Sequence, residues 1–275
     1  MRIHVIFATT GRAEVLGKVL TRLTDQTRAP DGVLVVGTCP ADVAGVENTF
    51  PGLQIIISEK GLCSQRNAGL AALGDHADVV VFFDDDFVPA HDFLEQVEAL
   101  MSADPGIVGL TGRLVRDGAQ TGSLMFEEAV DQLDVQHERP AAGEERMAWL
   151  YGCNMAIRLS ANPQLRFDEA LPLYGWQEDV DFSSRLARHG TLYRTAALTG
   201  IHLGVRGGAH VRLAAGLFPD RQCHLSAAQR DDPLPAWLAD LAVQCCGQCC
   251  GQPASQPPRS TAVGASKATG WRCAT

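Results

Sequence analysis

The sequence predicts an α/β domain with a mostly parallel sheet that is flanked by helices. Short segments that are apolar on both faces alternate with helical segments of about ten residues, which is typical of buried parallel strands covered by helices. Hydrophobic residues make up 46% of the 275 residues and charged residues 20%, so the chain can bury a sizeable core. No apolar run approaches the roughly 20 residues of a membrane helix.

The N-terminal half shows this alternation most clearly. Residues 2–8 are rich in β-branched and aromatic side chains and predict the first strand. Residues 13–24 carry apolar side chains along one face and predict an amphipathic helix. By the same reasoning, further strands are expected over 33–36, 54–57, 78–83 and 107–110, and further helices over 63–73 and 91–101.

The C-terminal half has a weaker pattern. Residues 112–146 turn polar, and we expect a mixed region of long loops there. A helix is expected over 178–188, because His189 and Gly190 end its apolar pattern. The remaining strands are expected over 149–159, 192–198 and 201–205.

Three consecutive carboxylates, Asp84, Asp85 and Asp86, follow the most apolar of the expected strands. Ligands of parallel sheets bind in the loops beyond the carboxyl ends of the strands. Several like charges in one place are costly unless a cation neutralises them, and Mg²⁺ and Mn²⁺ prefer carboxylate oxygens. Because alternate side chains of an extended segment share a face, Asp84 and Asp86 are expected to point the same way. An acidic loop that caps the next helix is the alternative interpretation.

Three further features suggest chemistry. Glu178 and Asp179 open an expected helix, whose dipole favours their charged forms; such a carboxylate suits a general base, and ordinary capping is the alternative. Arg66 lies in the first turn of a helix that follows a strand and suits a phosphate or a base, unless it is a solvated arginine. His202, in a glycine-rich segment, is either a metal ligand or a packed or surface histidine.

In their order, the motifs resemble those of the family 2 glycosyltransferases, which have the GT-A fold. They read Thr-Thr-Gly-Arg, Arg-Asn-Ala-Gly, Phe-Phe-Asp-Asp-Asp, Gly-Cys-Asn-Met-Ala-Ile-Arg and Trp-Gln-Glu-Asp-Val-Asp-Phe, at 9–12, 66–69, 82–86, 152–158 and 176–182. The resemblance covers roughly residues 1–206. It implies inverting transfer of a sugar from a nucleoside diphosphate sugar, a UDP-sugar first of all, with Mg²⁺ or Mn²⁺ as cofactor. The implied acceptor is a hydroxyl group in polysaccharide or glycolipid synthesis.

The resemblance also implies roles for single residues. Asp179 matches the catalytic base that deprotonates the acceptor, while Trp176 and Glu178 match positions on the acceptor side. Asp86 matches a metal ligand, and His202 resembles a late histidine that approaches the metal or the diphosphate. Contacts to the nucleotide sugar are implied for the loop and motif residues Thr9, Thr10, Arg12, Arg66, Asp84 and Asp85.

One departure and two rival functions accompany this resemblance. Many members carry an acidic residue directly after the second strand, whereas here Asp42 comes later, which leaves the recognition of the base open. A nucleotidyltransferase is the rival enzyme, although it would need a glycine-rich loop with a lysine after the first strand, where Thr9 to Arg12 stand. The other rival is a degenerate nucleotide-sugar-binding protein that is inactive because its C-terminus is altered.

Composition and cysteine positions bear on partners and location. The net charge of -9 disfavours a surface for nucleic acid or for anionic membrane lipids. The first residues lack the features of a signal peptide, and the scattered Cys39, Cys63 and Cys153 are typical of free thiols in a reducing compartment. A cytoplasmic location is therefore expected. A carbohydrate or lipid-linked acceptor would bring the protein to the inner face of the cell membrane.

The glycosyltransferase domain is expected over residues 1–214, followed by a tail over 215–275. The periodicity stops in this tail, and Cys-Cys-Gly-Gln-Cys-Cys stands at 245–250. Three interpretations stay open: a zinc site, a disordered segment and a frame-shifted terminus. The last of these is motivated by residues 216–229, for which one reverse translation shifted by a single base gives a family-like sequence.

Overall fold

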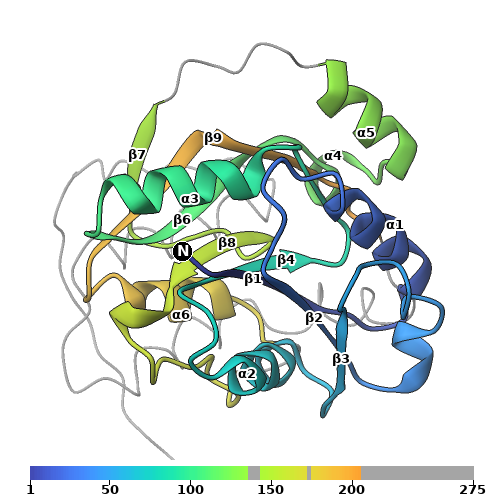
Figure 1. Cartoon of the computed structure of the whole chain (residues 1–275), viewed down its shortest axis with the longest axis horizontal. Coiled ribbons are helices and arrows are strands. Elements are labelled where there is room, and N and C mark those ends of the chain that lie inside the picture. The colour runs from blue at the N-terminus through green and yellow to red at the C-terminus, as the bar shows by residue number, and fades with distance from the viewer. Residues whose placement is uncertain (136–142, 172–174, 206–275) are drawn as a thin grey trace, which may run out of the picture. The chain divides into compact units, whose positions relative to one another are not determined.

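The computed structural model describes residues 1–135, 143–171 and 175–205 (Figure 1). Its strands are β1 (Ile3–Ala8), β2 (Gly32–Gly37), β3 (Gln54–Ile57), β4 (Val79–Asp84), β5 (Phe87–Pro89), β6 (Ile107–Asp117), β7 (Glu144–Met147), β8 (Asn154–Arg158) and β9 (Thr191–His202). Its α-helices are α1 (Ala13–Leu23), α2 (Leu62–Leu73), α3 (Phe93–Ala103), α4 (Gly118–Thr121), α5 (Phe126–Val135) and α6 (Glu178–Leu186). The short 3₁₀ helices are η1 (Pro40–Val43) and η2 (Leu159–Ala161).

The strands form one sheet in the order β3-β2-β1-β4-β8-β6-β9-β5, and β7 also pairs with β9. Strands β3, β2, β1, β4, β6 and β9 run in one direction, and β8, β5 and β7 run against them. The α/β fold with a mostly parallel sheet flanked by helices is therefore confirmed.

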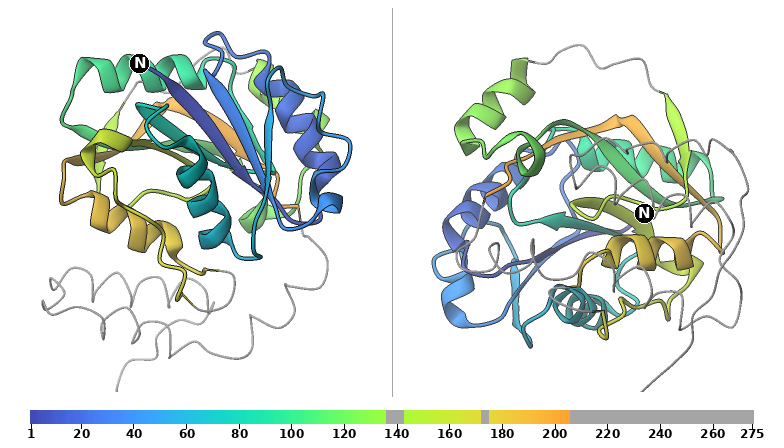
Figure 2. Two further views of the ribbon diagram at one scale, coloured as in Figure 1. Left: turned by 60° about the horizontal axis from the view of Figure 1, so that its bottom comes forward. Right: turned by 180° about the vertical axis from the view of Figure 1, so that it is seen from behind.

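Side-chain alternation gives the central strands two apolar faces. In β4, Val79, Val81 and Phe83 pack on one side of the sheet, and Val80 and Phe82 pack on the other. Helices α1 and α3 cover the first face, and α2 and α6 cover the second, so that the sheet lies between two helical layers (Figure 2). Burial on both faces explains why the sequence of β4 is continuously apolar.

The expectation of long loops over 112–146 is wrong. Strand β6 continues through this region to Asp117, and α4, α5 and β7 follow it. The first half of β6 is fully buried, but its second half is exposed or half-buried, so the apolar run stops before the strand does. Other boundaries also differ: β9 is one strand where two were expected over 192–198 and 201–205, and β8 is shorter than 149–159.

Strand pairing brings distant candidate residues to one place. Ala8, just before the Thr9 loop, lies opposite Asp84 in the β1–β4 pair. Asp117 at the end of β6 lies opposite His202 at the end of β9, and Phe87 of β5 pairs with the same histidine. The carboxyl ends of the parallel strands β1, β4, β6 and β9 therefore lie with the start of β5 at one edge of the sheet, where ligands of α/β sheets bind.

Two further expectations concern the ends of the chain and the membrane. Among the described residues, no helix has the length and apolar character needed to cross a bilayer. The expected domain boundary at 214 and the tail over 215–275, including its cysteine cluster, lie outside the described residues. Within the described part, Cys39, Cys63 and Cys153 are free thiols.

Candidate active site

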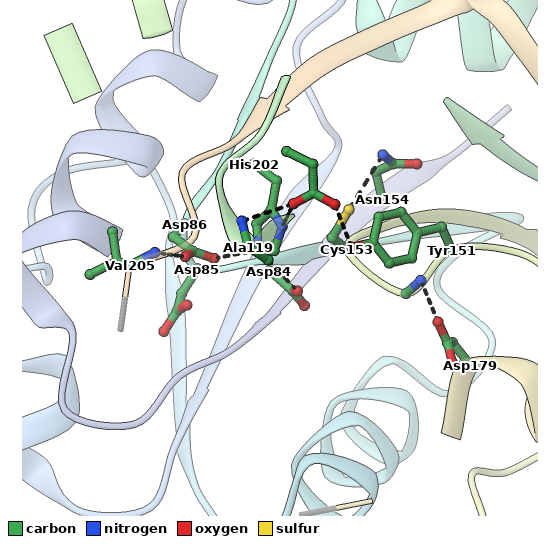
Figure 3. Close-up of polar contacts among 12 residues, drawn as sticks. Asp84, Asp85, Asp86, Ala119, Tyr151, Cys153, Asn154, Asp179, His202 and Val205 are labelled. Atoms are coloured by element: carbon green, nitrogen blue, oxygen red, sulfur yellow. Dashed lines mark hydrogen bonds and ion pairs between the residues drawn. The ribbon is translucent and has the colours of Figure 1, made fainter. Parts of the chain in front are cut away.

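The three aspartates at the end of β4 and in the turn that follows it face two different sides (Figure 3). Asp85 is fully buried against the loop after β1, where it accepts a hydrogen bond from the Thr9 hydroxyl at 2.7 Å and pairs with Arg12 at 2.7 Å. Burial raises the pKa of Asp85 to about 7 in spite of the Arg12 charge. Asp84 and Asp86 instead face the end of β9, although Asp85 and Asp86 form a turn between β4 and β5 and not the extended segment that was expected.

Asp84, Asp86 and His202 form a compact cluster. The Nε2 atom of His202 lies 3.3 Å from Asp86 Oδ1 and 3.9 Å from Asp84 Oδ2. The second oxygen of Asp86, Oδ2, accepts a hydrogen bond from the Val205 backbone N–H at 2.8 Å and pairs with Arg12 at 3.2 Å. The backbone and the arginine therefore orient Asp86 so that Oδ1 points into the cluster.

Asp117 holds His202 from its other side, and sequence analysis did not single it out. Asp117 Oδ1 lies 2.9 Å from His202 Nδ1, and Asp117 Oδ2 accepts a hydrogen bond from the Tyr151 hydroxyl at 3.1 Å. Burial disfavours the charged imidazolium, but hydrogen bonds to Asp117 and Asp86 raise the pKa of His202 to about 10. The sequence signal for Asp117 is a carboxylate followed by a glycine at a strand end. Because loops were expected over 112–146, no strand end was expected at this position.

Two glycines let the ends of β6 and β9 approach closely enough for this contact. A side chain on Gly118 would meet the Leu203 carbonyl oxygen at 2.1 Å. Gly204 has a φ of +66°, and a Cβ there would lie 2.2 Å from the Gly118 carbonyl carbon. Because no L side chain fits either position without a backbone shift, the glycine contact fixes Asp117 against His202.

A second pair of carboxylates begins α6. Asp179 Oδ2 accepts a hydrogen bond from the Gly152 N–H at 2.9 Å, and its Oδ1 accepts one from the Val180 N–H at 2.8 Å. The buried Glu178 accepts a hydrogen bond from Arg66 at 2.9 Å. Burial raises the pKa of Glu178 to about 7 and also raises the pKa of Asp179. A carboxyl group with a raised pKa is a stronger proton acceptor once it is ionised.

The backbone just before this pair is strained. Gln177 has a φ of 64° and, among the described residues, is the one non-glycine residue with a positive φ. Such a conformation costs on the order of 1–3 kcal/mol, and strained residues of this kind cluster at functional sites. Trp176, next to it, is 37% exposed and thus lies at the surface beside the start of α6.

Arg66 lies in the interior between the two groups of carboxylates. Its side chain is 2% exposed, so a solvated arginine is excluded. It donates hydrogen bonds to Asp84 at 3.2 Å, to Glu178 at 2.9 Å and to the Gly152 carbonyl at 3.0 Å. The structure therefore joins three of the sequence motifs through one guanidinium group.

Comparison with known proteins identifies the family. Residues 4–162, more than half of the chain, match the family described as Glycosyl transferase family 2. The chain belongs to this family. No curated protein gives a match to this glycosyltransferase-family chain.

Solved glycosyltransferases share the GT-A fold of this family member. S. aureus TarS (residues 1–349) in complex with UDP-GlcNAc superposes with a TM-score of 0.56 at 18% identity, over 80% of this chain and 62% of that one. The mannosyltransferase PcManGT from Pyrobaculum calidifontis, in complex with GDP-Man and Mn2+, superposes with a TM-score of 0.52 at 19% identity, over 75% of this chain and 58% of that one. The chain thus spans less than two thirds of either structure, and the likeness shows a common fold.

The divalent cation that the family resemblance implies fits the cluster of Asp84, Asp86 and His202. Two ligands of an octahedral ion with bonds of about 2.1 Å are about 3.0 Å apart when adjacent and about 4.2 Å apart when opposite. The separations of 3.3 Å and 3.9 Å around His202 Nε2 fall in this range. Asp86 Oδ1 is buried and lies 3.3 Å from His202 Nε2, so a cation bound between them would take the place of the imidazolium as the partner of this oxygen.

Asp42, the acidic residue that comes later than expected after the second strand, accepts hydrogen bonds mainly from backbone N–H groups. Its Oδ1 accepts a hydrogen bond from the Gly11 N–H at 2.7 Å. Its Oδ2 accepts hydrogen bonds from the Thr38 N–H at 2.8 Å, the Thr38 hydroxyl at 2.6 Å and the Cys39 N–H at 3.1 Å. Since a carboxylate offers about four lone-pair sites, Asp42 is occupied in joining the loop after β1 to the loop after β2.

Proposed function

We propose that the chain is an inverting glycosyltransferase that moves a sugar from a nucleoside diphosphate sugar to a hydroxyl acceptor. The observation that carries this proposal is the combination of two carboxylate centres with different chemistry. The Asp84–Asp86–His202 cluster fits a cation, and the Glu178–Asp179 pair has raised pKa values. The first centre suits a diphosphate, and the second suits the removal of a proton from an alcohol.

On the donor side, Asp84, Asp86 and His202 would hold the cation. A cation there supplies electrostatic stabilisation for the charge that develops on the leaving diphosphate. Two carboxylates and one imidazole fit Mn²⁺ better than Mg²⁺, because imidazole favours transition metals. We place Thr9, Thr10 and Arg12 under the nucleotide, with the buried Asp85 acting through its bonds to Thr9 and Arg12; these two bonds support the placement of that loop.

On the acceptor side, Asp179 is the proposed base, and Trp176 and Glu178 are proposed to line the acceptor. The Asp179 carboxylate would take the proton of the acceptor hydroxyl as the hydroxyl oxygen bonds to the anomeric carbon of the sugar. The bond from that carbon to the diphosphate breaks in the same step, and its electron pair leaves with the diphosphate. One displacement inverts the anomeric centre, and it uses one base. The Gly152 and Val180 backbone bonds to Asp179 support this role because they fix both carboxylate oxygens.

The donor, the acceptor and the domain follow from the same proposal. UDP-sugars are the proposed donors, and GDP-sugars are the first alternative, because TarS in complex with UDP-GlcNAc and PcManGT in complex with GDP-Man and Mn2+ share the fold. The proposed acceptor is a carbohydrate or lipid-linked hydroxyl in polysaccharide or glycolipid synthesis. The proposed catalytic domain spans 1–214 and works at the inner face of the cell membrane.

A nucleotide-sugar panel tests the proposal. Thermal unfolding of the full chain is measured with UDP-, GDP- and other nucleotide sugars, each with Mn²⁺, with Mg²⁺ and with chelator. A donor at 100 times its Kd should stabilise the fold by about 2.7 kcal/mol, and only when the metal is present. Product formation with candidate acceptors is then measured for each donor that binds. Binding without turnover would favour the degenerate nucleotide-sugar-binding protein, and the absence of any binding would refute the proposal.

A further inference from the structure

Arg66, for which the family resemblance implies a nucleotide contact, is a buried charge. Its side chain is 2% exposed, and its guanidinium carbon lies 5.5 Å from the centre of the Phe82 ring and 5.3 Å from that of the Phe167 ring. Arginine stacks on aromatic faces and is more weakly hydrated than lysine, so it tolerates such a site. The burial of the Arg66 side chain and its position over two aromatic rings show that it points into the interior of the domain.

The hydrogen bonds of Arg66 reach three separate parts of the chain. Nη1 donates to Glu178 Oε1 at the start of α6, and Nη2 donates to Asp84 Oδ1 at the end of β4. Nη2 also donates to the carbonyl of Gly152, whose N–H in turn donates to Asp179 Oδ2. One planar donor group therefore connects the donor-side aspartate, the acceptor-side glutamate and the backbone that holds the proposed base.

Space around this junction is tight. A Cβ on Gly152 would lie 3.1 Å from Asp179 Cβ and 3.2 Å from Glu178 Oε1. The start of α6 therefore packs directly on the segment before β8, with Arg66 bonded to both of them. A shift of the helix start would break the bond to Glu178 or the bond to Gly152.

We propose that Arg66 is a positioning residue, which fixes the start of α6 against the end of β4 and so sets Asp179 at a defined place relative to Asp84. This role, which rests on the proposed glycosyltransferase function, replaces the nucleotide contact that the sequence implied for Arg66. It leaves the cation cluster to Asp84 Oδ2, Asp86 and His202, because Arg66 engages the other oxygen of Asp84.

The charge of Arg66 also acts on Asp179. Burial raises the pKa of Asp179, while the Gly152 N–H and the positive Arg66 lower it. The other titratable groups that face Asp179 among the described residues are Glu178, Asp84 and the buried Cys153 thiol, of which the carboxylates oppose its ionisation. Removing the Arg66 charge should therefore raise the pKa of Asp179 further, which shifts its proton uptake to higher pH.

The test is a titration that does not need turnover. Full-length protein labelled with ¹³C at the aspartate carboxyl carbons is titrated by NMR, and the Asp179 signal is assigned by its loss in Asp179→Asn. Arg66→Gln should raise the pKa of Asp179 by about one unit, the lower end of what one nearby opposite charge contributes. Arg66→Lys keeps the charge and should rescue at least half of that shift. Binding of UDP with Mn²⁺, measured by calorimetry, should change by less than about threefold, because Arg66 lacks a nucleotide contact.

A comparison of unfolding temperatures keeps the proposal testable if Arg66→Gln is too unstable for the NMR titration. Removing one partner of a buried ion pair leaves the other charge unpaired, whereas removing both does not. The double variant Arg66→Gln/Glu178→Gln should therefore unfold at a higher temperature than Arg66→Gln. A double variant no more stable than Arg66→Gln would overturn the proposal.

The titration and the binding measurement have their own opposing outcomes. An unchanged Asp179 titration in Arg66→Gln would overturn the proposal, and a more than tenfold loss of UDP binding with that unchanged titration would restore the nucleotide contact. The proposed function has a separate failure, which is a wild-type protein that binds no nucleotide sugar in the panel.

Discussion

Asp86, just after β4, and Glu178, at the start of α6, are both buried, yet their pKa values move in opposite directions. Although burial opposes ionisation of Asp86, the neighbouring His202 and Arg12 lower its pKa, and His202 likewise lowers the pKa of Asp117. At α6, burial outweighs Arg66 and the backbone N–H groups, so the pKa of Glu178 rises to about 7 and that of Asp179 rises with it.

The difference lies in the cationic partners that each centre receives. Asp86 has Arg12 and His202 within 3.3 Å, in addition to the Val205 N–H. At α6, Glu178 pairs with Arg66, which also pairs with Asp84, and the same Arg66 charge acts on Asp179. A carboxylate kept ionised suits a cation, and a carboxylate close to its protonation point suits proton transfer. In the proposed mechanism, carboxyl groups would therefore serve two different chemistries because the number of their cationic partners differs.

The largest expected effect tests the α6 side of this comparison. Asp179→Asn keeps the hydrogen-bond geometry with Gly152 but removes the basic oxygen, so turnover should fall by about 10²–10⁴-fold while donor binding stays within about twofold. Steady-state kinetics and calorimetry measure the two quantities. Asp181→Asn is the matched control, because Asp181 lies on the same helix and pairs with Arg185. Wild-type turnover in Asp179→Asn would move the base to Glu178 or Asp181.

The next effect tests the β4 side. Asp86→Ala removes the carboxylate whose Oδ1 points into the cluster, so the affinity for a nucleoside diphosphate with Mn²⁺ should fall by more than about 100-fold, since partners one shell further out already account for 10–100-fold. Calorimetry with UDP and Mn²⁺ measures it. Asp78→Ala, a change at an exposed aspartate paired with Arg2, is the control. Equal affinity with and without chelator in the wild type would contradict the cation site.

A smaller effect is expected one contact further out. Asp117→Asn weakens the partner of His202 Nδ1, and such partners orient a ligating imidazole. Mn²⁺ affinity should fall by about 10–100-fold, as measured by electron paramagnetic resonance of free Mn²⁺ in a titration. Tyr151→Phe, which removes only the hydroxyl bond to Asp117, should give a smaller loss. If Asp117→Asn binds Mn²⁺ as the wild type does, His202 is not oriented by Asp117.

The parts of the fold and of the site that the sequence predicts are those marked by a local pattern of residues. The strand that ends at Asp84 is recognisable because burial on both faces leaves a continuous apolar run. The helix after Gln177 is recognisable because burial on one face leaves a periodic apolar pattern. The outer half of β6 lacks that pattern because it is only partly buried. The local motifs at 84–86 and 178–179 are therefore recognisable in the sequence, whereas the bounds of the strands around them are not.

Contacts between distant segments cannot be predicted from local sequence patterns. Asp117 and His202 are 85 positions apart, and only the parallel pairing of β6 with β9 makes them neighbours. The burial of Arg66 depends on Phe82 and Phe167, which belong to different parts of the chain. A motif thus indicates which residues carry chemistry, whereas the strand register decides which of them meet.

The smallest expected effect concerns the backbone at the start of α6. Gln177 is held at a φ of 64°, while the end of β4 has ordinary strand geometry. Gln177→Gly removes the strain of a left-handed non-glycine residue but adds chain entropy to the unfolded state, so the net gain should be no more than about 1 kcal/mol. For a domain of this size that corresponds to a rise in Tm of about 2–4 °C, measured by calorimetry.

The matched control separates backbone strain from the loss of a side chain. Gln177→Ala removes the side chain but keeps a Cβ at the same positive φ, so it should not share the gain in Tm. Turnover of Gln177→Gly should fall, because Asp179 lies two residues later in the first turn of α6 and a looser entry to this helix positions it less well. A gain in Tm that is equal in both variants would mean that the side chain, not the backbone conformation, is unfavourable here. In that case, backbone strain at Gln177 would not contribute to the positioning of Asp179.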